Sequence, residues 1–165
     1  LSGDYATAAK EYKKAAEQGN ADAQFHLGNM YDNGKGVLQD DKEAVKWYRL
    51  AAEQGDADAQ FNLGNMYSEG KGVLQDDKEA VKWYRLAAEQ GDDGAQSNLG
   101  VMYYSGQGVI QDNVYAHMWW NIAASEGFGA AKEKRDIIAE QMTPAQIAEA
   151  QKLARECVAK DYKGC

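Results

Sequence analysis

Glycine recurs in this sequence at a fixed interval of 36 residues, and this period constrains the fold more than any other feature. One series is Gly19, Gly55, Gly91 and Gly127, a second is Gly28, Gly64 and Gly100, and a third is Gly34, Gly70 and Gly106. A period of about 20 to 50 residues is the signature of an array built from one repeated supersecondary unit. The glycines are therefore expected to be turns of a regular array.

The copies align without gaps. Residues 15–50 and 51–86 differ at four of 36 positions, which are Asn20/Asp56, His26/Asn62, Asp32/Ser68 and Asn33/Glu69. Residues 87–122 match the second copy at 20 of 36 positions, and a fourth copy diverges after its first residues. The expected organisation is one solenoid domain over residues 1–165. It comprises a half repeat (4–19), three repeats (20–55, 56–91 and 92–127) and a divergent capping repeat (128–165).

Each unit is expected to form two helices. In the second copy, Asp56 is the predicted N-cap of the first helix, and Gly70 is its left-handed stop. The second helix is expected to begin at Asp76, which has Glu79 at the spacing of a capping box. Asp40 and Glu43 repeat this box in the first copy, whereas Tyr115 replaces the glutamate after Asp112 in the third. A weaker cap is therefore expected in the third copy.

Gly64 is expected in the middle of a helix, where glycine costs about 1 kcal/mol relative to alanine. This cost is consistent with a neighbouring backbone that approaches closely. One unit cannot bury its apolar face alone, so stability must come from contacts between neighbouring repeats. The predicted fold is therefore an all-α, α/α superhelical solenoid of helix-turn-helix repeats.

The repeat reads A-x-A-Q-x-x-L-G-x-M-Y, then G-x-G-V, then D-x-x-x-A-x-x-W-Y-x-x-A-A-E-Q-G. This pattern resembles the Sel-one-like repeat family, which is related to the tetratricopeptide repeats. The resemblance is strong from Asp4 to about Gly127 and weak beyond. It implies a protein-interaction scaffold, often in bacterial periplasmic or secreted proteins, and names no ligand. A cysteine-rich branch of the family is associated with β-lactam binding and slow hydrolysis.

The C-terminal segment has the pattern of a capping helix. Thr143, Pro144 and Gln146 are typical of a helix start with a capping box. The apolar stripe that follows is Ile147, Ala150, Leu153, Ala154 and Cys157, and the polar face is Gln151, Lys152, Arg155 and Glu156. Terminal repeats need such a polar outer face.

Both cysteines lie at this end, at Cys157 and Cys165. In one interpretation they form a disulfide, because their spacing resembles the bridges of the cysteine-rich branch, and Gly164 supplies flexibility for the approach. In the other, Cys157 is a buried apolar residue and Cys165 a free thiol. A disulfide implies an oxidising compartment. Free thiols would instead favour an intracellular, chaperone-like adaptor.

The charge balance excludes one class of partner. With 18 Lys and Arg against 26 Asp and Glu, the net charge is −8, whereas nucleic-acid binders carry basic patches. No apolar run of about 18 residues is present, so no transmembrane segment is expected. Because the first residue is Leu1, we expect a processed product whose signal peptide has been removed, and a periplasmic or secreted location.

Several motifs match catalytic or ligand-binding patterns only formally. Ser68 and Lys71 have the S-x-x-K spacing of β-lactamases, but the helix stop at Gly70 separates them. The Gly-Lys-Gly loops lack the strand and the further glycines of a phosphate cradle. No metal site is expected because His26 and His117 fall in distant repeats. No cofactor is expected either, and His117 is interpreted as a pH-sensitive surface group.

Aromatic residues recur at two adjacent repeat positions. Trp47, Trp83 and Trp119 occupy one, and Tyr48, Tyr84 and Trp120 the next. The second of each pair is expected to fill the core between repeats, and the tryptophan to cover the seam. In the third copy, Met118-Trp119-Trp120 has lost the charge of the Lys-Trp-Tyr pattern. It is expected to seat the capping repeat, with a docking site as the alternative.

The first helix of each pair is expected to line the concave side. The positions left after the core stripe is removed are Phe25, Asn29, Asp32, Phe61, Asn65, Ser68, Ser97, Val101 and Tyr104. Asn29 and Asn65 can each donate to and accept from a peptide backbone. The sequence therefore predicts a non-enzymatic scaffold that binds a protein or peptide here. The alternative is a β-lactam hydrolase, although the array lacks the cysteine pairs of that branch.

Overall fold

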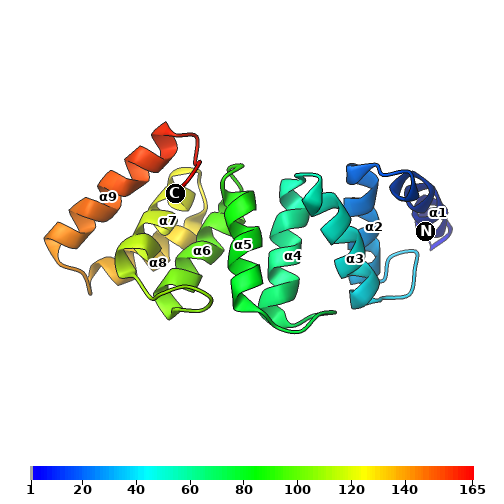
Figure 1. Ribbon diagram of the computed structural model, residues 1–165, viewed down its shortest axis with the longest axis horizontal. Helices are drawn as coiled ribbons and strands as arrows, with labels where there is room; N and C mark the ends of the chain where they lie inside the picture. The colour runs from blue at the N-terminus through cyan, green and yellow to red at the C-terminus, as the bar shows by residue number, and fades with distance from the viewer. Residues whose placement is uncertain (1) are drawn as a thin grey trace. The chain divides into compact units, whose positions relative to one another are not determined.

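The computed structural model describes residues 2–165, with side chains from Asp4 onward. No strand occurs among these residues. The helices are α1 (Ser2–Glu17), α2 (Ala21–Asn33), α3 (Asp41–Glu53), α4 (Ala57–Glu69), α5 (Asp77–Ala88), α6 (Asp93–Ser105), α7 (Asn113–Ser125), α8 (Gly129–Ala139) and α9 (Pro144–Ala159) (Figure 1). In the 36-residue register, α2, α4, α6 and α8 are the first helices of their repeats. The second helices are α1, α3, α5, α7 and α9.

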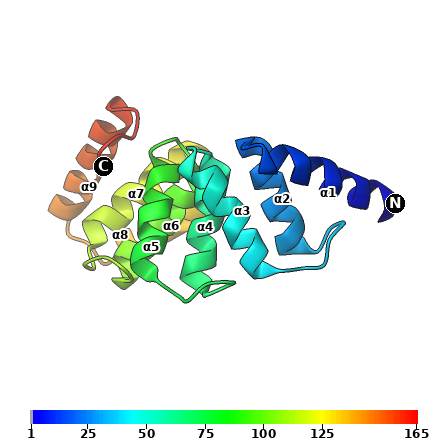
Figure 2. The ribbon, with the colours of Figure 1, turned by 45° about the vertical axis from the view of Figure 1, so that its right-hand side comes forward.

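The chain divides into two compact units, residues 1–76 and residues 77–165. In the N-terminal unit, α1 packs on α2, α2 on α3 and α3 on α4. Figure 2 shows α1 and α2 side by side. In the C-terminal unit, α5 packs on α6 and α6 on α7, while α7 contacts both α8 and α9. Helix α7 is therefore the element on which the C-terminal cap is built.

The first helices begin and end as predicted. The Asp56 carboxylate caps α4 by accepting from the backbone N–H of Ala59 at 2.7 Å. Gly70 ends α4 in the left-handed region, and its N–H donates to the carbonyl of Met66. The matching caps are Asn20 and Asp92, and the matching stops are Gly34 and Gly106.

The second helix of the first copy, α3, differs from the prediction at its N-terminus. Asp40 accepts from the N–H groups of Lys42 and Glu43, at 3.0 and 3.1 Å. The reciprocal half of the predicted box is absent, because the Glu43 carboxylate accepts from the Trp47 indole N–H at 3.2 Å, and the Asp40 N–H donates to a carbonyl of α2. The predicted contact of Glu43 with the backbone N–H of Asp40 is therefore wrong.

The expectation of a weaker cap in the third copy is also wrong. Asp112 makes the same two bonds as Asp40, to the N–H groups of Val114 and Tyr115, at 2.8 and 3.2 Å. The cap bonds come from the aspartate alone, so replacing the glutamate does not remove them. A complete capping box forms at Thr143 and Gln146, as predicted.

The second glycine of each Gly-x-Gly loop lies against the first turn of the second helix in the preceding repeat. A Cβ on Gly72 would lie 2.2 Å from the carbonyl oxygen of Asp41, and one on Gly108 would lie 2.3 Å from that of Asp77. Gly36 meets the carbonyl of Tyr5 in the same way. All three glycines also have φ between 70 and 74°. Both the space and the backbone conformation therefore require glycine.

Gly28 and Gly100, which hold the repeat position of Gly64, make room for an aromatic ring and not for the neighbouring backbone that was predicted at this position. A Cβ on Gly28 would lie 2.7 Å from the ring of Tyr48, and one on Gly100 would lie 2.4 Å from Trp120 Nε1. Tyr48 and Trp120 are both buried. The cost of glycine in the helix is offset by the burial of a large ring on the paired helix.

Buried polar side chains join neighbouring repeats at equivalent positions. The Gln24 amide donates to the carbonyl of Ala16 and the Gln60 amide to that of Ala52, both at 3.1 Å. These carbonyls lie in the last turn of the preceding second helix, and each also accepts from a backbone N–H of the following turn, that of Gly19 or Gly55. Each glutamine therefore gives a helix-end carbonyl its second hydrogen bond and ties it to the next repeat.

We expect Gly72→Ala to lower the free energy of unfolding by about 3 kcal/mol or more, because the methyl group clashes with a backbone carbonyl and the φ of 70° disfavours alanine. Gly55→Ala is the matched control: it has a φ of 97° and open space around its Cβ, so about 1 kcal/mol is expected. Urea unfolding followed by circular dichroism measures both. Equal losses for the two variants would contradict the role of the contact.

Candidate interaction site

The predicted surface residues lie on three first helices. Phe25, Asn29 and Asp32 are on α2, Phe61, Asn65 and Ser68 on α4, and Ser97, Val101 and Tyr104 on α6. All except Ser97 are at least partly exposed. The N-terminal unit holds the first six and the C-terminal unit the last three. The surface is therefore described separately in each unit.

In the N-terminal unit, the Tyr48 hydroxyl organises the polar side chains of α2. It donates to Asn29 Oδ1 at 2.8 Å and also approaches Asp32 Oδ2 at 3.5 Å. Burial, and then the charge of Asp32, raises the pKa of Tyr48 far above its ordinary value. Tyr48 therefore remains a neutral donor, and it fixes the Asn29 amide in one orientation.

Lys71 closes this network. Its ammonium group pairs with the carboxylate of Asp32 and lies 3.7 Å from that of Asp41. The hydrogen bond to Asp32 is the main reason why the pKa of Lys71 is raised. The Lys71 ammonium is thus engaged by the carboxylates of Asp32 and Asp41.

Ser97 does not belong to the surface, so this predicted contact residue is wrong. Only 2% of Ser97 is exposed, and its carbonyl accepts from the Trp120 indole N–H at 3.0 Å. At the matching positions of the first copy, Phe25 and Tyr48 lie with ring centroids 6.2 Å apart. The third copy thus has a small residue on the first helix and a larger ring on the second, and the tryptophan covers the serine.

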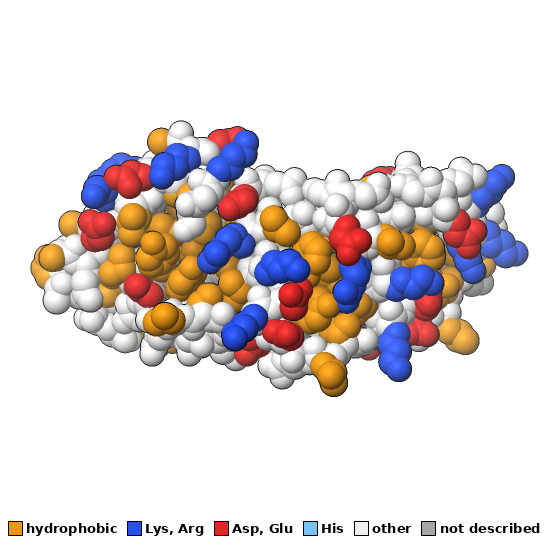
Figure 3. Space-filling model, viewed as in Figure 1, with side chains coloured by type: hydrophobic (Ala, Val, Ile, Leu, Met, Phe, Trp, Pro, Cys, Tyr) orange, Lys and Arg blue, Asp and Glu red, His pale blue; other side chains and the backbone are white. Residues whose placement is uncertain are grey.

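The C-terminal unit has a pocket of about 340 Å³ between α6, α7 and α8. Its lining residues are Val101, Tyr104, Trp120, Lys134, Ile137, Ile138 and Gln141. Two of them, Val101 and Tyr104, belong to the predicted surface. Ile137 is 61% exposed and Tyr104 is 42% exposed. Figure 3 shows hydrophobic side chains at the surface over the helices of this unit.

Trp120 belongs to the segment for which a docking site was the alternative interpretation, and the remaining lining residues were not predicted. Those on α8 lie in the diverged fourth copy, where the repeat pattern is weak. The 36-residue period nevertheless locates Ile137, which follows Val101 by one full repeat. Extending the register into the fourth copy would have identified α8 as a first helix.

The Met118-Trp119-Trp120 segment seats the capping repeat, as expected. All three side chains are buried. Trp120 forms one core cluster with Ala131 and Ile138 of α8 and with Ala150 of α9. The segment itself is therefore not available as a docking site, apart from the edge of Trp120 that lines the pocket.

His117 is buried and not a surface group, which corrects the prediction. Only 3% of His117 is exposed, and Nδ1 has no hydrogen-bond partner among the described residues. The same repeat position is a buried valine in the first two copies, Val45 and Val81. Burial, and then the charge of Arg135, lowers the pKa of His117. No group of three or more potential metal ligands occurs within residues 2–165.

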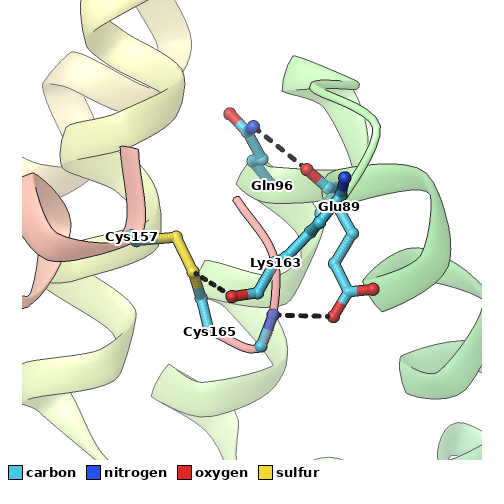
Figure 4. Close-up of a disulfide and its surroundings, with 7 residues drawn as sticks. Glu89, Gln96, Cys157, Lys163 and Cys165 are labelled. Carbon is cyan, nitrogen blue, oxygen red and sulfur yellow. Dashed lines mark hydrogen bonds between the residues drawn. A yellow bond between two sulfur atoms is a disulfide. The ribbon is translucent and has the colours of Figure 1, made fainter. Parts of the chain in front are cut away.

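Cys157 and Cys165 form a disulfide, which confirms the first of the two interpretations. The bond joins the end of α9 to the C-terminal residue, with the two Cα atoms 5.6 Å apart. The closed segment reaches back to other turns of its unit. The Gly164 N–H donates to Glu89 at 3.3 Å, close to the disulfide (Figure 4). The Tyr162 hydroxyl donates to Glu126 at 3.1 Å.

This arrangement of the tail could not be predicted from local sequence. Asp161 and Tyr162 both have positive φ, at 54 and 62°. Side chains other than glycine rarely adopt this conformation, so no residue preference announces it. Contacts with Glu89 and Glu126 span 75 and 36 residues, beyond the reach of helix periodicity.

Helix pairs that recur in one 36-residue register define an α-repeat protein as the class. The sequence pattern of the Sel1 repeat family matches residues 2–20, 21–56, 57–92 and 94–128. The chain belongs to the Sel1 repeat family, and its fold is an all-α repeat solenoid. Proteins of this family generally serve as protein-interaction scaffolds.

Two solved structures are similar over most of the chain. A Sel1 repeat protein from Oxalobacter formigenes is 39% identical with a TM-score of 0.72, covering 92% of this chain and 55% of that one. The protein c5321, a protective antigen present in uropathogenic Escherichia coli strains and displaying an SLR fold, is 33% identical with a TM-score of 0.71, covering 93% of this chain and 42% of that one. The chain thus spans about half the length of these relatives. Among curated proteins, none matches.

We expect His117 to make the protein less stable as the pH falls. The folded state holds the pKa of His117 below its ordinary value of 6.5, so below that pH the unfolded chain takes up a proton that the folded chain excludes. The free energy of unfolding then falls by at most about 1.4 kcal/mol per pH unit. His117→Val, which restores the residue of the first two copies, removes this contribution.

Urea unfolding at pH 7, 6 and 5 measures the effect. His26→Asn, which copies Asn62 of the second repeat, is the control that leaves His117 in place. The wild type and the control should lose more stability than His117→Val over this range. Parallel losses in all three proteins would show that His117 does not titrate as described.

Proposed function

We propose that this chain is a non-enzymatic scaffold that binds an extended segment of a partner protein along its first helices, on the side expected to be concave. The proposed contact residues are Phe25, Asn29, Asp32, Phe61, Asn65, Ser68, Val101 and Tyr104, without the buried Ser97. Repeat scaffolds commonly use such equivalent positions because stacked units present them in a row.

The arrangement of Asn29 is the observation that carries this proposal. Its oxygen accepts the hydrogen bond from Tyr48, so its orientation is set before any partner arrives. The Asn29 amide N–H groups donate to no acceptor among the residues that the structure describes, and the side chain is partly exposed. A fixed, unused donor pair suits the carbonyl groups of an extended backbone, and prior ordering lowers the entropy cost of binding.

Nothing in the site favours the hydrolase alternative. Lys71 is held by two carboxylates, and the only cysteines are the bonded pair at the C-terminus. The cysteine-rich branch that suggested this activity carries pairs throughout its repeats. The scaffold therefore accounts for the residues with fewer assumptions.

A periplasmic or secreted location is part of the proposal. The Cys157–Cys165 disulfide supports it, because such bonds persist in oxidising compartments and are rare where thiols are kept reduced. Within the part of the chain that the structure describes, no helix is long and apolar enough to span a membrane. The envelope fraction is therefore the material from which partners are sought.

The test is affinity capture from the envelope fraction of the producing organism, quantified by mass spectrometry. Asn29→Asp combined with Asn65→Asp removes the amide donors at both positions, and at position 29 it keeps an oxygen for the Tyr48 hydroxyl. Loss of two hydrogen bonds predicts about a tenfold fall in recovered partner. Circular dichroism melting confirms that the variant is folded.

Gln18→Glu combined with Gln151→Glu is the matched control. It changes the net charge by the same amount at two exposed positions outside the first helices. The control should retain the partner. Equal recovery by the asparagine variant and the wild type would refute binding along the first helices, and retention of no protein above a tag-only sample would refute the scaffold.

A further inference from the structure

The pocket in the C-terminal unit is lined by residues of first helices at a repeat position whose side chain differs between the early and the late copies. Val101 and Ile137 are separated by 36 residues and hold the same repeat position as Asn29 and Asn65. This position is thus an amide in the first two copies and an aliphatic side chain in the last two. Both aliphatic residues line the pocket. An amide suits a peptide backbone, whereas the aliphatic pair suits an apolar side chain.

The walls of the pocket are aromatic and aliphatic. The rings of Tyr104 and Trp120 lie with centroids 5.9 Å apart, and Ile137 on α8 is well exposed opposite α6. A volume of about 340 Å³ is large enough for one leucine or aromatic side chain. Placing such a group there removes apolar surface of both partners from water, at roughly 25 cal/mol per Å².

One charged side chain lines this otherwise mainly apolar pocket. Lys134 is partly buried there and forms no ion pair within the described residues, although the chain carries a net charge of −8. The neighbouring Arg135, by contrast, is already bonded to Asp136 and to Asn121. The Lys134 ammonium is therefore available for a carboxylate brought by a ligand, and the reduced exposure strengthens that interaction relative to open solvent.

We propose that this pocket binds a large apolar side chain of the partner protein that has an aspartate or glutamate beside it. The apolar group enters between Tyr104 and Ile137, and the carboxylate pairs with Lys134. This inference rests on the proposed function and names the kind of segment that the scaffold recognises. Aromatic and aliphatic anchors in a pocket, flanked by a charge pair, are the usual basis of such recognition.

The test begins with a random dodecapeptide library displayed on phage and selected on the full chain. Recovered peptides are synthesised with a fluorophore and titrated by fluorescence anisotropy. They should share a leucine, isoleucine or phenylalanine next to an aspartate or glutamate. Ile137→Ser should weaken them by about tenfold or more, because it removes one wall of the pocket.

Lys134→Met tests the charge pair separately, since it keeps the length of the side chain. It should weaken the acidic peptides several-fold and should have no effect on versions in which the aspartate is replaced by asparagine. The difference between the two peptide versions should also shrink at high salt. Such non-additivity would locate the carboxylate at Lys134.

Two matched controls lie in the same unit. Ile110→Ser removes an aliphatic side chain that is 89% exposed and outside the pocket, and Lys132→Met removes an exposed charge from the same helix, α8. Neither should change the affinity. Losses equal to those of the pocket variants would overturn the proposal.

Other outcomes separate this inference from the function on which it rests. If Ile137→Ser leaves the affinity for the peptides unchanged while Asn29→Asp with Asn65→Asp abolishes binding, the pocket proposal is wrong and the scaffold proposal stands. Selection of basic peptides, or failure of any sequence to enrich, would also overturn the pocket. Failure of partner capture from the envelope would refute the scaffold itself.

Discussion

The contact on which the repeat array depends is the one between the second glycine of each Gly-x-Gly loop and the carbonyl oxygen of the preceding second helix. At Gly36, Gly72 and Gly108 a side chain would lie within 2.3 Å of that oxygen. The loop can therefore lie directly on the helix only where Cβ is missing. Since the loop follows directly on the first helix of its repeat, this contact also helps to place that first helix on the second helix of the preceding repeat.

Once the spacing is set, equivalent residues in successive repeats can do different work. In the first copy the rings of Phe25 and Tyr48 pack together between the paired helices. In the third copy the same two positions hold Ser97 and Trp120, and the larger tryptophan ring packs over the small serine. Asn29 and Asn65 are succeeded by Val101 and Ile137. The backbone plan is constant, whereas the surface changes from hydrogen-bonding to apolar along the chain.

Periodicity predicted the architecture because helix starts and stops depend on local residues. Asp56, Gly70 and the Thr143 box lie where their chemistry placed them. Prediction failed where a residue had two possible partners. Glu43 bonds to Trp47 and not to its own helix start, and Gly28 and Gly100 face rings and not backbone. Ser97 is buried because Trp120 bonds to its carbonyl, and His117 occupies a repeat position that is also buried in the first two copies, as Val45 and Val81.

The C-terminal tail illustrates the same limit. The cysteine spacing was compatible both with a disulfide and with two free thiols, and the structure contains the disulfide. The segment that it closes is hydrogen-bonded to other repeats, through Gly164 to Glu89 and through Tyr162 to Glu126. Contacts of this kind depend on how repeats stack and not on local propensity. Helix α9 packs on α7, which also contributes Trp120 to the pocket.

The most direct test of the account is hydrogen exchange of the chain, alone and with its captured partner. Backbone amides are followed by mass spectrometry at the level of single helices. If the partner binds along the first helices, the amides of α2, α4, α6 and α8 should exchange more slowly in the complex, whereas those of α3 and α5 should change little. Protection confined to the second helices or to the exposed loops would contradict it.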